Sequence, residues 1–372
     1  MPTTLREISK GRRASAAAEV MVRSAADERE VDEAYELAAR TFGPDYFVAS
    51  ANKVRIRELE PLHDLRDLIV AVCDGAVVGM VRIVDRRVRL KTRALKVGGV
   101  TSVCVHPKFQ QRGYGRTLME IAIRRMRQRG DACSIAFTRR AVDGFYPKLG
   151  YVGLGCHPEM TVTFPLAGAL EERSIDASRL PKPDSRQSEA YAEAYENSYG
   201  SLPMSFERSE AWWEKLLLRM SPEIPSEQFT AVTVGRRVVG YFIARQRQII
   251  EAASLPDDQE TVACEVIAHV ARQGNNHSFL LPLNHWLLHR LRRYNHTLSV
   301  RYSWDGGHMV RALDHQLAEA IGGKATERAG ALDVTDHSQA CVWVLRVMGV
   351  VRSESGSISV PMLPTWTRMD EF

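Results

Sequence analysis

Short apolar runs separated by glycine-containing turns fill the first half of the chain. Leu68–Cys73 is one continuous apolar run, and Val77–Val84 follows it after Asp74-Gly75. An Asp-Gly pair between two such runs is a strong short-range signal for a β-hairpin. The pattern therefore predicts a buried strand and its antiparallel return.

Helical patterns flank this hairpin. Residues 22–43 carry apolar positions at helical spacing, and Ser24 is the expected N-cap because acidic residues follow it. Residues 114–129 show the same spacing, and Gly130 stands at the expected stop. We therefore predict helices before and after the strands of this half.

The order of elements then repeats. Residues 71–81 and 231–242 share an Ala-Val…Gly…Val-Val-Gly pattern. In the second copy, the apolar run Thr261–Ala268 is the expected strand after the hairpin. A helix over residues 281–293 and a strand over 297–304 complete the order. Self-similarity at this scale indicates a tandem duplication, and chance similarity of two hairpins is the alternative.

Composition and charge bound the class of protein. With 372 residues the chain is too long for one typical core, so two domains are expected. The hydrophobic content is 45% and the net charge is +5, which suits an anionic ligand. The basic run Arg124–Arg129 lies on the outer face of its predicted helix, which favours a solvated surface. No nucleic-acid partner is expected.

Six scattered cysteines, none in a CxxC spacing, lie mostly in apolar runs. This usage favours a reducing compartment over a disulfide framework. The sequence also shows no signal peptide and no apolar run of membrane-spanning length. A cytoplasmic protein without a membrane partner is the expectation.

The segment Gly98–Leu118 is the most informative stretch. It begins as an apolar strand that ends at Val105, turns at Pro107, and enters a helix through Gln-Gln-Arg-Gly-Tyr-Gly at residues 110–115. A helix N-terminus presents unpaired N–H groups, and glycine lets the backbone approach an anion closely. The pattern predicts an anion site, and a glycine-rich turn without a ligand is the alternative.

This strand and loop resemble the acetyl-coenzyme A loop of the GCN5-related N-acetyltransferases (GNATs). The resemblance implies that acetyl-coenzyme A is the acyl donor, that the loop amides hold its pyrophosphate, and that no metal takes part. It also implies that strands 99–105 and 133–137 splay apart so that the pantetheine arm can pair with the first of them. The implied cofactor-binding residues are Val103, Cys104, Val105, Gln110, Gln111, Arg112, Gly113, Tyr114, Gly115 and Arg116.

Acetyl transfer also needs a proton donor for the departing thiolate and a proton acceptor for the amine. The family often places a tyrosine after the fifth strand, and Tyr146 in Tyr-Pro-Lys-Leu-Gly-Tyr matches it, whereas Tyr151 fits a core position. Many members carry a glutamate on the fourth strand. Here Thr101-Ser102 stands there, and Glu265 holds the comparable place in the second half.

The tandem pattern resembles one subgroup, the bacterial enhanced intracellular survival (Eis) acetyltransferases. These have an active first module, a degenerate second module and a sterol-carrier-like third domain, almost all of which is missing here. In the subgroup the tyrosine is the general acid and a terminal phenylalanine carboxylate is the base, which makes Tyr146 and Phe372 the catalytic candidates. A frayed terminus is the alternative for Phe372. Val270–His277, the expected counterpart of the cofactor loop, lacks the second glycine, so we expect no coenzyme A there.

The expected fold class is α+β (α/β), with two tandem GNAT-like modules, each a mixed, mostly antiparallel sheet flanked by helices. The expected organisation is a flexible tail at 1–20, a catalytic acetyl-coenzyme A-binding domain at 21–165, a linker at 166–184, a degenerate GNAT-like domain at 185–350 and a tail at 351–372.

The predicted activity is acetyl transfer to a primary amine on a small molecule. Two alternatives stay open: a non-catalytic acyl-coenzyme A-binding regulatory or scaffolding protein, and a protein lysine or N-terminal acetyltransferase. The acceptor pocket is expected from residues 42–47 and 139–145, where Asp45 and Asp143 hold a cationic amine or only shape turns. The second module completes this pocket or forms a homo-oligomer interface.

His285 and His289 are four residues apart on a predicted helix, a spacing that can place two metal ligands on one face. Apolar residues separate the two, and the glutamate of a protease motif is absent. Packing is the favoured interpretation, so no metal is expected.

Overall fold

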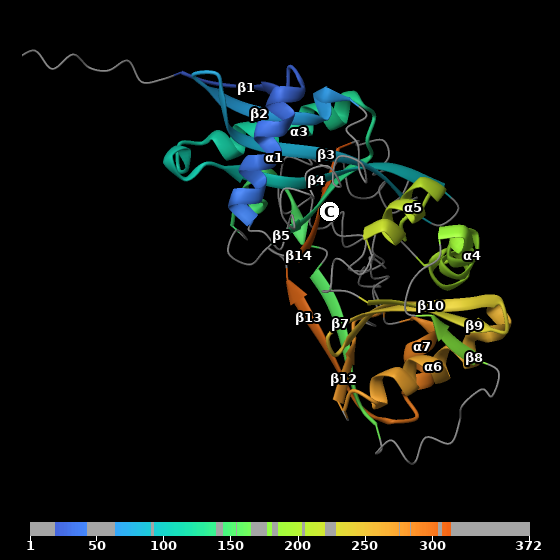
Figure 1. The fold of residues 1–372 in the computed structure, drawn as a ribbon. Helices are drawn as coiled ribbons and strands as arrows, with labels where there is room; N and C mark the ends of the chain where they lie inside the picture. Colours follow the sequence, from blue (N-terminus) through green and yellow to red (C-terminus); the bar gives the residue numbers. More distant parts are fainter. Residues whose placement is uncertain are drawn as a thin grey trace, which may run out of the picture.

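Two seven-stranded mixed sheets with helices packed on them make up the protein (Figure 1). The computed structural model describes residues 19–42, 64–90, 93–138, 144–153, 155–164, 177–180, 185–202, 205–219, 228–274, 276–282, 284–303 and 307–313. The expected α+β class, with two mixed sheets flanked by helices, is confirmed.

The first sheet has the strand order β1-β2-β3-β4-β5-β14-β6. Helix α1 (Glu28–Phe42) covers one face, where it packs on residues such as Leu68 and Met80. Helix α3 (Tyr114–Gln128) covers the other face, where it packs on residues such as Ile69 and Val81. The strands are β1 (Val20–Ser24), β2 (Leu68–Cys73), β3 (Ala76–Leu90), β4 (Arg93–Val105), β5 (Cys133–Thr138), β6 (Val152–Gly153) and β14 (Gly307–Ala312).

The second sheet has the order β13-β7-β12-β11-β10-β9-β8. Its strands are β7 (Gly155–Thr163), β8 (Ala177–Leu180), β9 (Gln228–Val234), β10 (Arg237–Arg245), β11 (Gln248–Ser254), β12 (Asn276–Phe279) and β13 (Asn295–Ser303).

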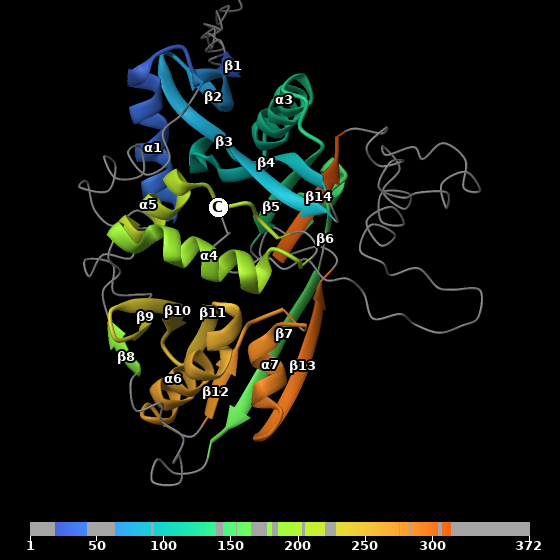
Figure 2. The ribbon, with the colours of Figure 1, turned by 90° about the vertical axis from the view of Figure 1, so that its right-hand side faces the viewer.

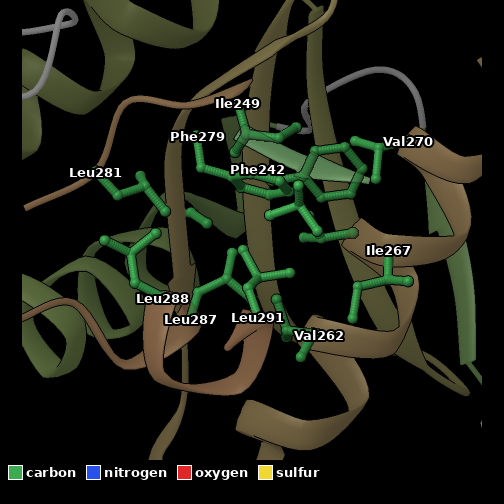
Figure 3. Close-up of a cluster of buried hydrophobic side chains, with 14 of the residues drawn as sticks. Phe242, Ile249, Val262, Ile267, Val270, Phe279, Leu281, Leu287, Leu288 and Leu291 are labelled. Carbon is green, nitrogen blue, oxygen red and sulfur yellow. The ribbon is translucent and has the colours of Figure 1, made fainter. Parts of the chain in front are cut away.

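Helices cover both faces of this second sheet as well. Helices α4 (Ser188–Tyr199) and α5 (Glu210–Arg219) pack on one face, which looks toward the first sheet (Figure 2). Helices α6 (Gln259–Ala271) and α7 (Trp286–Leu291) pack on the other, around Phe242 (Figure 3). Among the described helices, none is long and apolar enough to cross a membrane.

Both predicted hairpins are confirmed. Asp74 and Gly75 join β2 to β3 with φ values of 49° and 78°, as the Asp-Gly signal requires. In the second sheet, the two residues before Arg237 join β9 to β10 in the same way. The predicted strand at 133–137 and helix at 114–129 also match β5 and α3 closely.

The predicted N-cap at Ser24 is wrong. Ser24 ends β1, which pairs antiparallel with β2. The helix begins at Glu28 instead, because Asp27 Oδ1 accepts from the Glu30 amide (2.9 Å) and Glu30 Oε2 accepts from the Ala26 amide (2.8 Å). Glu30 thus reaches the amide one residue before the N-cap Asp27, and this variant of the capping box satisfies two amides at the helix start.

The predicted strand at Thr261–Ala268 is also wrong, because this run lies within α6. The buried residues of α6 include Val262, Val266 and Val270, four residues apart, so one helical face meets the core. Figure 3 shows Val262 and Val270 on this face. A short apolar run does not distinguish a buried strand from a buried helix. The strand that follows the hairpin is β11, which the sequence reading missed.

Two further expectations need adjustment, and a third is confirmed. The helix expected over 281–293 is shorter, since α7 has only six residues, whereas the strand expected at 297–304 matches β13 closely. The stretch expected as a linker at 166–184 contains β8, which pairs with β9.

The two sheets exchange strands. β7 follows the strands of the first sheet along the chain, yet it lies between β13 and β12 in the second. β14 follows all strands of the second sheet, yet it lies between β5 and β6 in the first (Figure 2). No single point of the chain separates the two sheets.

A β-arm adds a second connection. β3 and β4 pair far beyond the end of β2, out to Leu90↔Arg93. The free edge of this arm pairs with the segment before α5, where the Arg89 amide donates to Ser205 O (2.8 Å) and the Glu207 amide donates to Arg87 O (2.9 Å). The modules are therefore joined by main-chain hydrogen bonds as well as by the chain itself.

Candidate functional site

Strands β4 and β5 part from each other in the middle of the first sheet. Their parallel pairing begins at Val97↔Cys133 and stops at Val100↔Ala136, although β4 continues to Val105. Beyond Val100, β4 has no partner strand on this side among the described residues. The splay that the family resemblance implies is therefore present.

A β-bulge reshapes β4 at this point. Met80 pairs with Cys104 but Arg82 pairs with Thr101, so two residues of β4 oppose one of β3. Ser102 has φ 56°, in the left-handed region that few residues other than glycine adopt. The bulge sits where the two strands part and turns the backbone there.

The backbone at the end of β4 faces the gap. The His106 amide donates to Val78 O on β3 (2.8 Å), so alternation directs the amide and carbonyl of Val105 away from β3. The Val105 carbonyl accepts from Gln110 Nε2 (2.8 Å), which ties the following loop to the strand. Gln110 therefore shapes the loop in this structure.

The loop between β4 and α3 is tight and rich in left-handed residues. A 3-10 turn, Pro107–Phe109, opens it, and His106 Nδ1 accepts from the Lys108 amide. Gln111 and Gly113 then take φ values of 60° and 86°. Gly113 is the N-cap of α3, and its left-handed conformation favours glycine.

The start of α3 is built to receive an anion. Gly113 has no side chain to cap the first turn, and that turn, which holds Tyr114, Gly115 and Arg116, contains no acidic residue. Its amides are therefore left for an external acceptor. Arg112 lies over the Phe109 ring, 5.7 Å from its centroid, and adds positive charge beside them.

Tyr146 packs in the same core cluster as this helix and the parted strands. It is 7% exposed and shares a core cluster with residues of β4, β5 and α3. Its ring packs edge-on against Phe145, with centroids 5.1 Å apart. A Cβ on Gly115 would lie 3.6 Å from Phe145 Cζ and 3.9 Å from Val105 Cγ2. The loop glycine, the end of β4 and the tyrosine segment thus meet at one place.

Tyr151 is a core residue, as predicted. It is fully buried and shares a hydrogen bond of 2.6 Å with Ser134 Oγ. Burial raises the pKa of its phenol above the ordinary value. The phenol therefore keeps its proton, and the ring packs edge-on against that of Tyr146, with the centroids 5.6 Å apart.

The side chain of Cys104 points away from this site. It packs on the α1 face, in the cluster that contains Leu68 and Met80. Burial raises the pKa of the thiol to about 12, so it is not a thiolate at neutral pH. Of the implied cofactor contacts, Cys104 can contribute only its backbone.

The corresponding edge in the second sheet is closed by the protein itself. The Leu255 amide donates to Val239 O (2.9 Å), so Ser254 and Ala252 present their amides and carbonyls away from β10, as Val105 does from β3. The Ser254 amide donates to Ser198 Oγ (3.0 Å), and its carbonyl accepts from Asn197 Nδ2 (2.7 Å).

Ala252 is satisfied in the same way. Its amide donates to the Tyr199 hydroxyl (3.3 Å), and its carbonyl accepts from His285 Nε2 (3.0 Å). His285 Nδ1 accepts from the Leu287 amide, so both ring nitrogens are engaged. Burial lowers the pKa of His285 to about 3, and the ring is neutral. This histidine is a helix cap and a strand partner.

The counterpart of the cofactor loop in the second sheet is not Val270–His277, as expected from the sequence. That segment spans the end of α6 and the start of β12. The true counterpart joins β11 to α6 through the 3-10 turn Pro256–Asp258. It has no glycine, and Asp258 pairs with Arg237 (3.0 Å) at the helix start.

Glu265 is likewise not the counterpart of the strand glutamate, since it lies on α6. Glu251 on β11 takes that place, three residues before the strand ends at Ser254, as Ser102 is three residues before Val105. Glu251 is fully buried and paired with Arg208.

Several predicted residues lie outside the described part of the chain. These are Phe372, Asp45 and Asp143.

Comparison with known proteins identifies a family for part of the chain. Residues 22–153 match the family described as acetyltransferase (GNAT) domain. No curated protein matches the chain.

Solved structures match over most of the chain. A GCN5-related N-acetyltransferase from Kribbella flavida is 20% identical with a TM-score of 0.59, covering 81% of this chain and 73% of that one. Eis1 from Mycobacterium abscessus is 16% identical with a TM-score of 0.56, covering 81% and 75%. A probable N-acyltransferase from Enterococcus faecalis is 12% identical with a TM-score of 0.62, covering 79% and 73%.

At these identities the solved structures establish a shared fold, while the family match covers β1 through β6 with the loop and Tyr146. Residues 22–153 are a GNAT N-acetyltransferase domain.

Proposed function

We propose that this protein transfers an acetyl group from acetyl-coenzyme A to a primary amine on a small molecule, by direct attack within a ternary complex. The observation that carries the proposal is the parting of β4 from β5 beside the uncapped start of α3. A strand edge suits the amide-bearing pantetheine arm, and glycine-lined helix amides suit a pyrophosphate.

The chemistry assigns a role to Tyr146. The amine nitrogen forms a bond to the thioester carbonyl carbon, and the C–S bond breaks when the tetrahedral intermediate collapses. Tyr146 donates its phenolic proton to the leaving sulfur, which departs as a thiol. Its packing against Phe145, which lies beside Gly115, supports this role.

No carboxylate on β4 is available to accept the amine proton, because Thr101 and Ser102 occupy the position where many family members carry a glutamate. By the resemblance, the terminal carboxylate of Phe372 accepts the amine proton. Deleting Phe372 tests this assignment: a shifted acid limb of the pH–kcat profile supports it, and an unchanged profile with unchanged turnover removes it.

The missing carboxylate on β4 favours one other function, a regulatory protein that binds acyl-coenzyme A without turnover. A thiol-release assay against a panel of small amines, histone-like peptides and peptide N-termini separates the functions. Release that depends on a small amine supports the proposal. Tight coenzyme A binding without release under any acceptor supports the regulatory binder, and release only with peptides supports protein acetylation.

A further inference from the structure

β14 completes the sheet that carries Tyr146. It pairs with β5 over six residues, from Gly307↔Thr138 to Ala312↔Cys133. It also pairs with β6 at Val310↔Val152, and β6 has no other neighbour in the described sheet. The short strand that follows Tyr146 is therefore attached to the first sheet through a segment that comes after the second.

Arg311 on β14 contacts the turn that begins at Tyr146. Its guanidinium donates a hydrogen bond to the Leu149 carbonyl, at the end of the 3-10 turn Pro147–Leu149. A Cβ on Gly150 would lie 3.6 Å from Arg311 Nη1, so the guanidinium lies directly under this turn. In the strand register, Arg311 is opposite Ser134, which holds the Tyr151 hydroxyl.

The same turn holds the backbone of Tyr146 in place. The Leu149 amide donates to the Tyr146 carbonyl (2.9 Å), and the Tyr151 amide donates to the same carbonyl (3.2 Å). Met309 of β14 is fully buried in the cluster that contains the Tyr146 ring. Arg311 therefore supports one side of a closed turn whose first residue is the candidate acid.

We propose that Arg311 is a positioning residue for Tyr146, so that a strand supplied after the second sheet completes the acyltransfer site of the first. This inference rests on the proposed role of Tyr146 as general acid. Displacement of a catalytic group by about 1 Å can lower a rate on the order of a hundredfold. Loss of the Arg311 contact is expected to reduce kcat at least tenfold without weakening the cofactor loop.

A double-mutant cycle on the full chain tests it. We expect Arg311→Met to lower kcat about tenfold or more and to leave KM for acetyl-coenzyme A within about twofold. Arg311→Lys keeps a cationic donor and should recover part of the loss. Arg290→Met, at an exposed arginine that pairs with Glu260, is the matched control and should leave kcat unchanged.

Repeating the substitution in a variant that lacks the Tyr146 hydroxyl distinguishes positioning of Tyr146 from a general effect on folding. In a Tyr146→Phe background, Arg311→Met should cause no further loss of kcat, because the residue that it positions has lost its proton. An equal loss in both backgrounds overturns the inference. If Arg311→Met does not fold, as judged by its thermal melt, Arg311→Lys carries the same cycle. Unchanged kcat in Tyr146→Phe alone overturns the proposed acid instead.

Discussion

Arg208 and Glu251 form a fully buried ion pair in the second module, with 2.6 Å between Arg208 Nη1 and Glu251 Oε1. The guanidinium also lies 3.8 Å from the Tyr195 ring centroid and 4.1 Å from that of Trp212. Glu251 lies three residues before the end of its strand, as Ser102 does in the first sheet. The region that is a bulged, parted edge in the first sheet is therefore a closed core in the second.

Removing one partner of this pair should destabilise the protein strongly. Arg208→Met leaves the Glu251 carboxylate buried without its cation, and the free energy of unfolding should fall by about 3–5 kcal/mol. Arg290→Met, which breaks an exposed pair, should cost no more than about 1 kcal/mol. Urea denaturation at pH 7 measures both, and equal costs would contradict the buried-pair account.

Coenzyme A should bind at one site per chain. The strand edge at Ala252 and Ser254 is occupied by side chains of α4 and by His285, and no glycine loop opens α6. Isothermal titration with coenzyme A should give a stoichiometry near one. A stoichiometry near two would contradict this prediction. A stoichiometry near one that is unchanged when the loop between β4 and α3 is mutated would contradict it as well.

Two glycines at opposite ends of α3 offer a matched test of the loop. Gly113 and Gly130 have φ values of 86° and 73°, and neither has an atom within 4 Å of a built Cβ. Alanine at either position should cost about 1 kcal/mol of stability through left-handed strain. Only Gly113→Ala should raise KM for acetyl-coenzyme A, because only its backbone borders the anion site. Equal KM values in the two variants argue against that site.

Tyr146→Phe should lower kcat by a factor of about a hundred or more, the usual contribution of a positioned general acid, with KM for acetyl-coenzyme A nearly unchanged. Tyr191→Phe is the control. Tyr191 is a buried phenol in the second module, whose hydroxyl donates to Gln187. Steady-state thiol release measures both, and a comparable fall in the control would point to a general loss of folded protein.

Stability should decrease as the pH falls below neutrality. The folded-state pKa of His285, about 3, lies below its ordinary value of 6.5, so the unfolded chain takes up a proton that the folded chain refuses. The contribution is complete above pH 6.5 and is lost as the pH falls toward 3. Between pH 7 and pH 5 it amounts to about 2 kcal/mol.

The variant His285→Asn isolates this effect. Asparagine can still cap α7, since its side-chain oxygen accepts a backbone hydrogen bond as His285 Nδ1 does. It does not titrate in this range, so the difference in unfolding free energy between pH 7 and pH 5 should shrink. An identical pH dependence in the variant would show that other groups cause the loss.

The sequence predicts the parts of this fold that depend on local chemistry. Asp74-Gly75 determines a hairpin, and the spacing of apolar residues between Tyr114 and Gln128 determines a helix. The loop from Gln110 to Gly115 is recognisable because glycine has a conformational role there that neighbouring residues cannot alter. The parting of β4 from β5 is predicted only from the resemblance to the family, because no local pattern in the sequence indicates it.

Features that depend on distant segments could not be predicted. The run Thr261–Ala268 is short and mostly apolar, so its secondary structure depends on the layer that it joins. The bulge at Ser102 leaves no sequence signal because serine is not a typical left-handed residue. Arg311 gains its place only through the pairing of β14 with β5, and nothing near it in sequence indicates that partner.

The exchange of β7 and β14 also bears on how the protein is made. Thr138 and Met309, which are in contact in the finished sheet, are 171 residues apart. At ordinary rates of translation, roughly 10–30 s separate the synthesis of β5 from that of its neighbour. Until then β5 presents an unpaired edge, the kind of template on which chains pair wrongly with one another. Synthesis of the N-terminal half alone would leave that edge exposed permanently, so the acetyltransferase domain should not be produced as a separate fragment.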